Sequence, residues 1–358
     1  AYSKVFRADF IPVRWRYDEG MSKWSSSKLN YSAPDEEMLK AIYTDSALVV
    51  AIRDNKLLTT CSQPCLILYM IDIADIAKGD HVLEIGTGSG YNAALISEIV
   101  GEENIASIEI ESEVAEIAKK NLERAGKEIA VITGDGGMGF SPYAPYKAII
   151  VTCATPDIPW FDQLQDGGTI IIPLLTRGLE MLCRFVKRGD RLVGKPLLPV
   201  RFLTFTGLDA IKADYKKNIH SLTALVKKAQ PVENLTNEFI KLSRTERNSF
   251  KYYLSLLAKE AIYFVSDDED VSDGYGIWKK TLPFGIVLIQ GNKIIHWGDP
   301  AALNQFDSYF SMWKASKLKY DDYDIVVYPH DLHKEIPKEG LIVDKKFNSY
   351  SFIPKNGQ

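Results

Sequence analysis

Three short segments carry residue types that can bind a nucleoside. The first is Gly86-Thr87-Gly88-Ser89-Gly90, preceded by the acid Glu84. Glycines between a strand and a helix let a ligand approach the backbone closely. The second is Glu109, whose carboxylate can accept hydrogen bonds from a ribose diol. The third is Gly134-Asp135-Gly136, beside which we expect an adenine to lie.

The spacing of the glycines narrows the choice of ligand. The loop reads G-x-G-x-G, whereas dinucleotide folds use G-x-G-x-x-G. A site that binds adenosine without a pyrophosphate indicates S-adenosylmethionine as the cofactor, with S-adenosylhomocysteine as its product. A glycine-rich loop alone is also typical of a tight turn without a ligand, and Glu109 alone of a charge at a helix N-terminus. The prediction therefore depends on the three segments together.

Strands must alternate with helices to bring these segments to one place. Short apolar runs predict strands over 81–85, 105–110, 129–133, 146–154 and 167–174, then a hairpin turning at Gly189-Asp190 and a last strand over 200–207. Between them, helical patterns cover 62–77, 91–101, 111–126 and 160–165. In the first helix, Ser62 can cap the N-terminus and Pro64 fits the first turn. This alternation predicts an α/β fold with a mostly parallel, doubly wound sheet, as in Rossmann-like methyltransferases.

A second, smaller domain is expected after the sheet. We divide the chain into 1–208 and 209–358, because aromatic residues become more frequent after residue 208. Residues 210–262 read as two or three helices, followed by a hairpin around Gly291-Asn292, a helix over 300–317 and a strand over 323–329. These elements predict an α+β domain. Its aromatic side chains are interpreted either as a peptide-recognition surface or as the domain's own core.

Composition excludes several classes of protein. The 358 residues carry 43 Lys and Arg against 47 Asp and Glu, a net charge of −4, whereas a nucleic-acid binder usually has a basic excess. No apolar run reaches the ~18 residues of a membrane helix, and the first residues lack the apolar core of a secretion signal. The four cysteines form no C-x-x-C pair. We therefore expect a cytoplasmic protein without a metal site.

Several motifs in order connect the chain to a known family. They include Thr60-Cys61-Ser62-Gln63-Pro64, VLEIGTGSGYNAA at 82–94, SIE at 107–109, GDGGMG at 134–139 and QLQDGG at 163–168. With them, the chain resembles the protein-L-isoaspartate O-methyltransferase family over about residues 35–207. The resemblance implies an S-adenosylmethionine-dependent carboxyl O-methyltransferase.

The resemblance also implies roles for individual residues. The catalytic hydroxyl of the family falls on Ser62, which would orient a substrate carboxylate rather than form a covalent bond; the competing interpretation is a helix cap. Family contacts to the cofactor fall on Thr60, Cys61, Ser62, Ser89, Glu109, Asp135 and Gly136, and a C-terminal-strand threonine falls on Thr206. Together with Glu84 and the loop from Gly86 to Gly90, these residues form the predicted cofactor site.

The chain departs from repair enzymes in its N-terminal part and in its length. It resembles a branch that methylates one Asp of a ribosomally made peptide (lasso, ATP-grasp-cyclised or lanthionine type), leading to an aspartimide and in some products to isoaspartate. Arg7, Arg14 and Arg16 are a candidate surface for such a peptide, or else a solvated edge. General isoaspartyl repair and a non-catalytic peptide-binding module remain alternatives, and the oligomeric state stays open.

Overall fold

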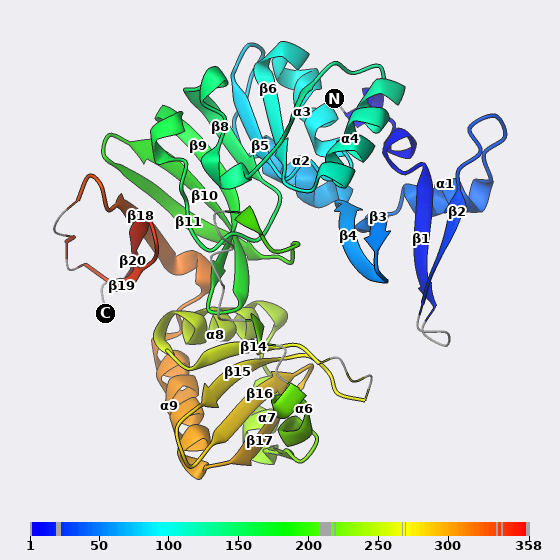
Figure 1. Cartoon of the computed structure of the whole chain (residues 1–358). Helices are drawn as coiled ribbons and strands as arrows, with labels where there is room; N and C mark the ends of the chain where they lie inside the picture. The colour runs from blue at the N-terminus through cyan, green and yellow to red at the C-terminus, as the bar shows by residue number, and fades with distance from the viewer. Residues whose placement is uncertain are drawn as a thin grey trace. The chain divides into compact units, whose positions relative to one another are not determined.

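The computed structural model describes residues 2–18, 23–207, 216–217, 220–266, 268, 270–333, 336–337 and 339–355. The chain divides into two compact units (Figure 1). The first unit contains Ala1–Pro173, Arg184–Leu192 and Phe202–Asp209, and the second contains Leu174–Cys183, Val193–Arg201 and Ala210–Gln358. The boundary predicted between 208 and 209 lies outside the described residues. The second unit differs from the predicted tail because it also takes in parts of three long strands.

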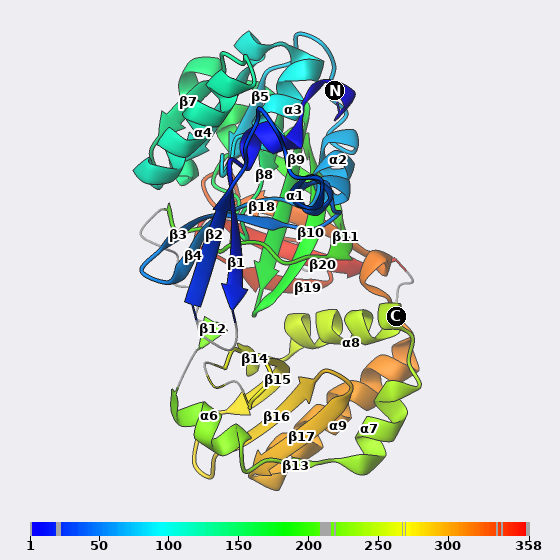
Figure 2. The same ribbon diagram turned by 90° about the vertical axis from the view of Figure 1, so that its right-hand side faces the viewer.

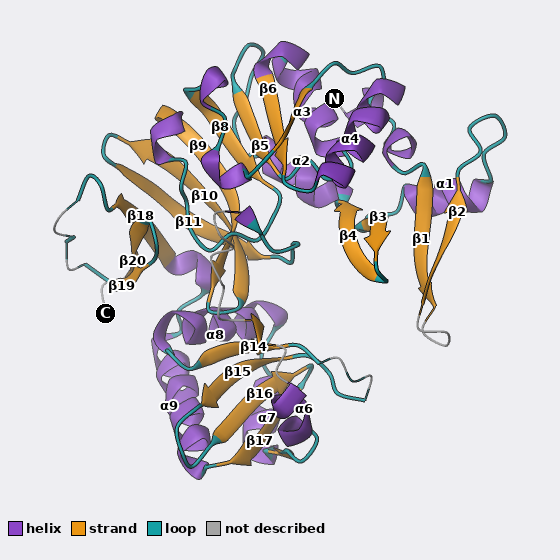
Figure 3. Cartoon of the chain, viewed as in Figure 1, coloured by secondary structure: helices purple, strands orange, loops and turns teal. Residues whose placement is uncertain are grey.

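The first unit contains an alternating series of strands, helices and short 3-10 turns (Figure 3). In chain order these are η1 (Tyr2–Lys4), η2 (Arg7–Phe10), β1 (Val13–Asp18), β2 (Lys23–Lys28), α1 (Glu36–Ile42), β3 (Leu48–Arg53), β4 (Lys56–Cys61), α2 (Pro64–Asp72), β5 (Val82–Ile85), α3 (Tyr91–Val100), η3 (Glu102–Asn104), β6 (Ile105–Glu109), α4 (Ser112–Arg124), β7 (Ala130–Thr133), η4 (Gly136–Met138), η5 (Ser141–Tyr143), β8 (Tyr146–Val151) and η6 (Phe161–Gln163). Three strands are shared between the units: β9 (Leu164–Thr176), β10 (Leu179–Arg188) and β11 (Arg191–Pro199).

Parallel strands in the order β7-β6-β5-β8-β9 form the centre of the first unit. Helix α3 packs against β6, and α4 packs against β6 and β7 (Figure 1). The chain moves outward from β5 to β7 and then returns to place β8 on the other side of β5. Ligands of open α/β sheets bind at such a reversal, outside the carboxyl ends of the strands. The predicted doubly wound parallel sheet is confirmed.

Three predictions of local structure are wrong. The helix expected over 160–165 is only the 3-10 turn η6, and β9 already begins at Leu164. Helix α2 begins at Pro64 with Gln63 in the N-cap position, so Ser62 precedes the helix and does not cap it. The expected strand over 200–207 is reduced to one parallel bridge between Ala154 and Thr204. The strand β8 ends at Val151, so beyond that residue it offers no extended strand with which residues 200–207 could pair.

The second unit contains its own sheet, which is antiparallel except that β12 pairs with β14 in parallel. Its further elements are β12 (Lys216–Lys217), α6 (His220–Val226), β13 (Gln230–Pro231), α7 (Glu233–Ile240), α8 (Arg244–Leu257), β14 (Ala261–Phe264), β15 (Gly274–Lys279), β16 (Gly285–Gln290), β17 (Lys293–Gly298), α9 (Pro300–Ser316), η7 (Tyr320–Asp322), β18 (Tyr323–Pro329), β19 (Leu341–Asp344) and β20 (Asn348–Pro354). The six-stranded sheet runs β12-β14-β15-β16-β17-β13, and helix α9 packs on β15 and β16 (Figure 2). Strands β19, β20 and β18 continue from β11 in the ten-stranded sheet that also contains the parallel strands β9, β8, β5, β6 and β7.

Aromatic side chains form much of the core of this second unit. Phe250 of α8 is fully buried, with its ring centroid 5.5 Å from that of Phe306, 4.9 Å from Phe310 and 5.5 Å from Trp313. Val287 of β16 points into this aromatic core, while the neighbouring strand residues form a second apolar cluster, as alternation along a strand requires. The core interpretation of these aromatics is therefore confirmed. No helix among the described residues is long and apolar enough to cross a membrane.

Phe250→Ala is expected to lower the free energy of unfolding of the second unit by about 3–5 kcal/mol, because it removes a fully buried ring and leaves a cavity. The matched control is Phe284→Ala, since the side chain of Phe284 is 43% exposed. Urea denaturation followed by hydrogen exchange of the two units measures both changes. An equal loss in the two variants would contradict the assigned core.

Candidate functional site

The loop between β5 and α3 has a backbone that only glycine adopts readily. Gly86, Gly88 and Gly90 have φ values of 96°, 56° and 86°, in the region that L side chains rarely occupy. Space is also short, because a Cβ atom on Gly86 would lie 2.6 Å from Oγ1 of Thr152, and one on Gly90 would lie 3.2 Å from Leu122. The loop therefore packs tightly against its neighbours at these two glycines, and a side chain there would collide with Thr152 or Leu122.

Beneath this loop lies a buried hydrogen-bond network, which we call the Glu84 network (Glu84, Thr87, Asn92 and Ser107). The carboxyl group of Glu84 accepts hydrogen bonds from Nδ2 of Asn92 at 2.6 Å and from Oγ of Ser107 at 2.5 Å. The hydroxyls of Ser107 and Thr87 are 2.6 Å apart. Burial raises the pKa of Glu84 to about 7, against the lowering effect of its two hydrogen bonds.

The Glu84 network corrects one of the predicted cofactor contacts. Glu84 is fully buried, and both of its oxygens bind side chains of this chain. Glu84 therefore supports the loop from below instead of contacting a ligand. Thr87 is also buried and serves the same network.

Glu109, at the end of β6, is the acid that faces the loop. Its Oε2 accepts a hydrogen bond from the backbone N–H of Gly88 at 3.0 Å, and its Oε1 accepts one from the N–H of Glu111 at 3.1 Å. Burial raises the pKa of Glu109, while these backbone hydrogen bonds oppose the rise. A carboxylate has about four acceptor positions, so Glu109 retains capacity for a ribose diol.

Asp135 and Gly136, at the end of β7, are tightly packed. Oδ1 of Asp135 accepts a hydrogen bond from the N–H of Gly137 at 2.8 Å, and Nε1 of Trp160 donates to the carbonyl of Gly136 at 2.7 Å. A Cβ atom on Gly207 would lie 1.9 Å from Oδ1 of Asp135. The absence of a side chain at residue 207 therefore lets the Asp135 carboxylate keep its position.

The end of β4 meets the glycine loop. A Cβ atom on Gly88 would lie 3.3 Å from both Oγ1 of Thr59 and the carbonyl oxygen of Thr60. The following residue, Cys61, is buried, and burial raises the pKa of its thiol. Ser62 is half-buried, and its hydroxyl makes no hydrogen bond within the described part of the chain. Ser62 follows Thr60 by two residues, so its hydroxyl lies on the segment that leads from this loop contact to α2.

Ser89 and Thr206 are the remaining predicted residues. Ser89 is buried in the loop, and its carbonyl accepts a hydrogen bond from Nδ2 of Asn121 at 3.0 Å. Thr206 is exposed; its neighbours Phe205 and Gly207 pack on Gly136 and Asp135, so its role stays a prediction.

The prediction that Arg7 belongs to a basic surface is wrong, because its side chain is fully buried. Arg14 is half-buried on β1, and Arg16 of the same strand is exposed.

Four residues of the site have no clear local signal in the sequence. Ser107 and Asn92 hold Glu84, Thr152 lies against Gly86, and Gly207 lies against Asp135. The only indication of Gly207 in the sequence is its place at the end of the strand expected over 200–207.

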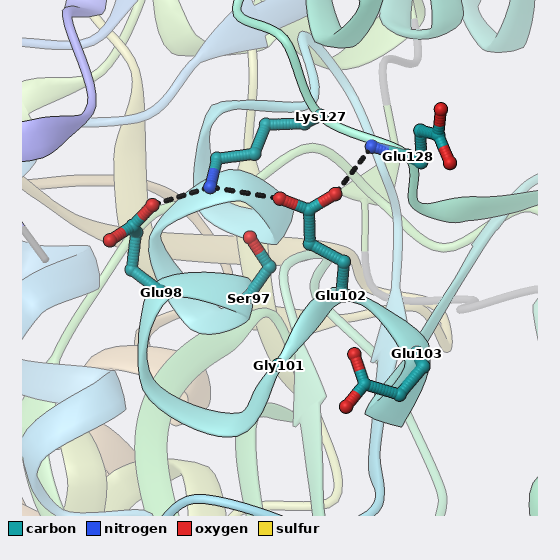
Figure 4. A pocket seen from close by; sticks show the side chains of 7 residues that line it. All are labelled: Ser97, Glu98, Gly101, Glu102, Glu103, Lys127 and Glu128. Carbon is teal, nitrogen blue, oxygen red and sulfur yellow. Dashed lines mark hydrogen bonds and ion pairs between the residues drawn. The ribbon is translucent and has the colours of Figure 1, made fainter.

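A separate hollow lies at the opposite end of α3 from the glycine loop (Figure 4). Lys127 lines it and forms ion pairs with Glu98 and, at 3.1 Å, with Glu102. The hollow is lined by Ser97, Glu98, Gly101, Glu102, Glu103, Lys127 and Glu128. It contains none of the predicted cofactor residues, so we assign it no part in the site. Within the described ranges, no three His, Cys, Asp or Glu side chains are grouped as metal ligands.

Comparison with sequence families gives one match over half of the chain. The model of the protein-L-isoaspartate(D-aspartate) O-methyltransferase family matches residues 31–210. The protein-L-isoaspartate O-methyltransferase of Pyrococcus horikoshii is 50% identical over 135 residues, which are 37% of this chain and 61% of the relative. That of Thermotoga maritima is 38% identical over 186 residues, 49% of this chain and 58% of the relative. The chain thus spans about three-fifths of the length of these two curated relatives.

A solved structure extends the similarity. A protein-L-isoaspartate O-methyltransferase structure is 25% identical, with a TM-score of 0.51, and the match covers 90% of this chain and 90% of that one. This coverage is larger than either unit, so the similarity includes residues of both units.

Gly207→Ala is expected to weaken S-adenosylmethionine binding about as much as Asp135→Ala, because the new methyl group displaces the carboxylate. Loss of a hydrogen bond to a charged group costs about 1.5–3 kcal/mol, or roughly 10–150-fold in affinity. In an Asp135→Ala background, Gly207→Ala should add little, since the group it displaces is absent. Titration calorimetry of the two single variants and the double variant measures this; full additivity would contradict the role given to Gly207.

Glu84→Gln is expected to remove part of the pH dependence of stability. The folded pKa of Glu84, about 7, is above its ordinary value of 4.5, so the folded state binds the proton more tightly. This contribution is fully present below about pH 4.5 and is lost as the pH rises through about 7. Between pH 6 and 8, the free energy of unfolding of the wild-type protein should fall by about 1 kcal/mol, and that of the variant should not fall in this way. Urea denaturation of both proteins at pH 6 and pH 8 measures this difference. An equal change in the free energy of unfolding for the two proteins would contradict the raised pKa.

Proposed function

Because the chain belongs to the protein-L-isoaspartate(D-aspartate) O-methyltransferase family, we propose that it is an S-adenosylmethionine-dependent carboxyl O-methyltransferase acting on isoaspartyl residues of proteins or peptides. The main observation is the approach of the β4 end to the glycine loop, where Thr59 and Thr60 lie against Gly88. Ser62 follows two residues after this contact, which supports a role for its hydroxyl next to the predicted cofactor loop.

The donor set around the loop supports the choice of cofactor. Glu109 has acceptor positions for a ribose diol, and Asp135 offers a carboxylate at the neighbouring strand end. The loop of residues 86–90 has the left-handed backbone at Gly86, Gly88 and Gly90 that a glycine-rich cofactor loop needs. When bound, S-adenosylmethionine supplies a methyl group on a sulfonium centre, which a carboxylate oxygen can take to form an ester.

The protein's own contribution is placement. A free carboxyl group has a pKa of about 4, so a substrate carboxylate is already ionised at pH 7 and needs no general base. The hydroxyl of Ser62 can donate a hydrogen bond to one carboxylate oxygen and leave the other directed at the methyl group. Such alignment raises the rate by proximity. Ser62 is therefore an orienting residue and forms no covalent bond.

A dedicated peptide substrate is a second candidate. In that case the enzyme esterifies one ordinary Asp of a ribosomally made, cyclised peptide, and the neighbouring amide nitrogen displaces methanol to form an aspartimide. The hairpin β1–β2 and most of the second unit lie outside the residues matched by the family model, and they offer surface for such a peptide. Against this candidate, a solved family structure covers both units, and the aromatics of the second unit are used in its core.

The substrate is tested by mass spectrometry with the full chain and S-adenosylmethionine. Three peptides of one sequence are compared: linear with isoaspartate, linear with Asp, and cyclised with Asp. We expect a mass gain of one methylene on the isoaspartyl peptide alone, and Ser62→Ala should lower turnover much more than cofactor affinity. Methylation of the cyclised Asp peptide alone, followed by loss of methanol, would favour the dedicated role. Absence of methylation on all three peptides would contradict the proposal.

A further inference from the structure

The N-terminal segment places a buried guanidinium group beside Ser62. Arg7 is fully buried, and it lies outside the residues matched by the family model. It donates hydrogen bonds to five backbone carbonyls: Ile42 at 2.6 Å, Thr44 at 2.7 Å, Ser46 at 2.7 Å, Cys61 at 3.4 Å and Ser62 at 3.0 Å. No carboxylate of the described residues lies within ion-pair distance of it. One side chain therefore joins the segment 42–46 to Cys61, which ends β4, and to Ser62, which follows it.

Asp45, on the same segment, holds the other side of residue 62. Its Oδ2 accepts a hydrogen bond from Nε2 of Gln63 at 2.9 Å, and its Oδ1 accepts one from the N–H of Cys65 at 2.9 Å. The hydrogen bond from Cys65, with that from Gln63, lowers the pKa of Asp45. Asp45 thus takes the place at the start of α2 that a capping side chain usually has.

We infer that Arg7 is a positioning residue for the hydroxyl of Ser62, with Asp45 as the second hold on the same backbone. Ser62 belongs to no helix or strand, and its hydroxyl has no hydrogen bond within the described residues. Its position is therefore fixed by its backbone, which Arg7 and Asp45 bind on either side. This inference rests on the proposed function, in which that hydroxyl binds the substrate carboxylate.

Two physical arguments favour this role over plain structural support. Burying a charge without a carboxylate partner is costly, so a position needed only for packing is filled better by a neutral side chain. The planar fork of arginine can bind several carbonyls at fixed angles, which a lysine ammonium cannot reproduce.

The test separates positioning from stability by a double-mutant cycle in the full chain. Arg7→Lys keeps the charge and loses the fork, and Asp45→Ala removes the second hold at an exposed residue, where folding is preserved. Each is combined with Ser62→Ala. The matched control is Arg124→Met: Arg124 binds the carbonyl of Asp9 at 2.6 Å, and so holds the same N-terminal segment without contacting residues 61–62. The linear isoaspartyl peptide is the substrate; kcat, KM, Tm and the Kd of S-adenosylmethionine are measured.

We expect Arg7→Lys and Asp45→Ala to lower kcat by about tenfold or more, since misplacement by 1 Å can cost about 100-fold. The Kd of S-adenosylmethionine should stay unchanged, and Arg124→Met should keep the wild-type kcat. In the Ser62→Ala background the two losses should disappear, because the hydroxyl they position is absent. Losses that persist in that background, or a wild-type kcat in both single variants, would overturn the inference alone. A wild-type protein that methylates no peptide would overturn the proposed function and this inference with it.

Discussion

The buried carboxyl group of Glu84 is the interaction on which the rest of the site depends. It joins β5, which carries it, to β6 through Ser107 and to α3 through Asn92. Through Ser107 it also reaches Thr87 in the glycine loop. These hydrogen bonds hold the four members together, although Oδ1 of Asn92 has no hydrogen-bond partner among the described residues. The network therefore fixes the loop in one position, against which Glu109 and the end of β4 are placed.

Much of the first unit could be predicted from local signals. The strands β5, β6, β7 and β8 are short apolar runs bounded by glycine or polar residues, and the helices between them have clear ends, such as Gly101 after α3. Since parallel strands place their carboxyl ends at one edge, Glu109 and Asp135 follow directly from that order. The interpretation of Glu84 as a ligand contact failed because sequence does not distinguish an acid beneath a loop from one above it.

The rest of the site depends on contacts between distant residues. Arg7 binds carbonyls 35 and 55 residues away, and no periodic pattern reports such a contact. Gly207 matters because Asp135 lies against it, which only the folded chain reveals. In the second unit, composition showed many aromatics but could not decide between core and surface; the rings of Phe250, Phe306 and Phe310 pack together in the core.

The central claim is that adenosine binds at the carboxyl edge of the sheet, between the glycine loop, Glu109 and Asp135. A crystal structure of the full chain with S-adenosylhomocysteine tests it most directly. We expect the ribose hydroxyls to bind the carboxylate of Glu109 and the adenine to lie beside Asp135 and Gly136. Glu84 should still be bound to Ser107 and Asn92. Density for the ligand elsewhere, or a ribose held by Glu84, would contradict it.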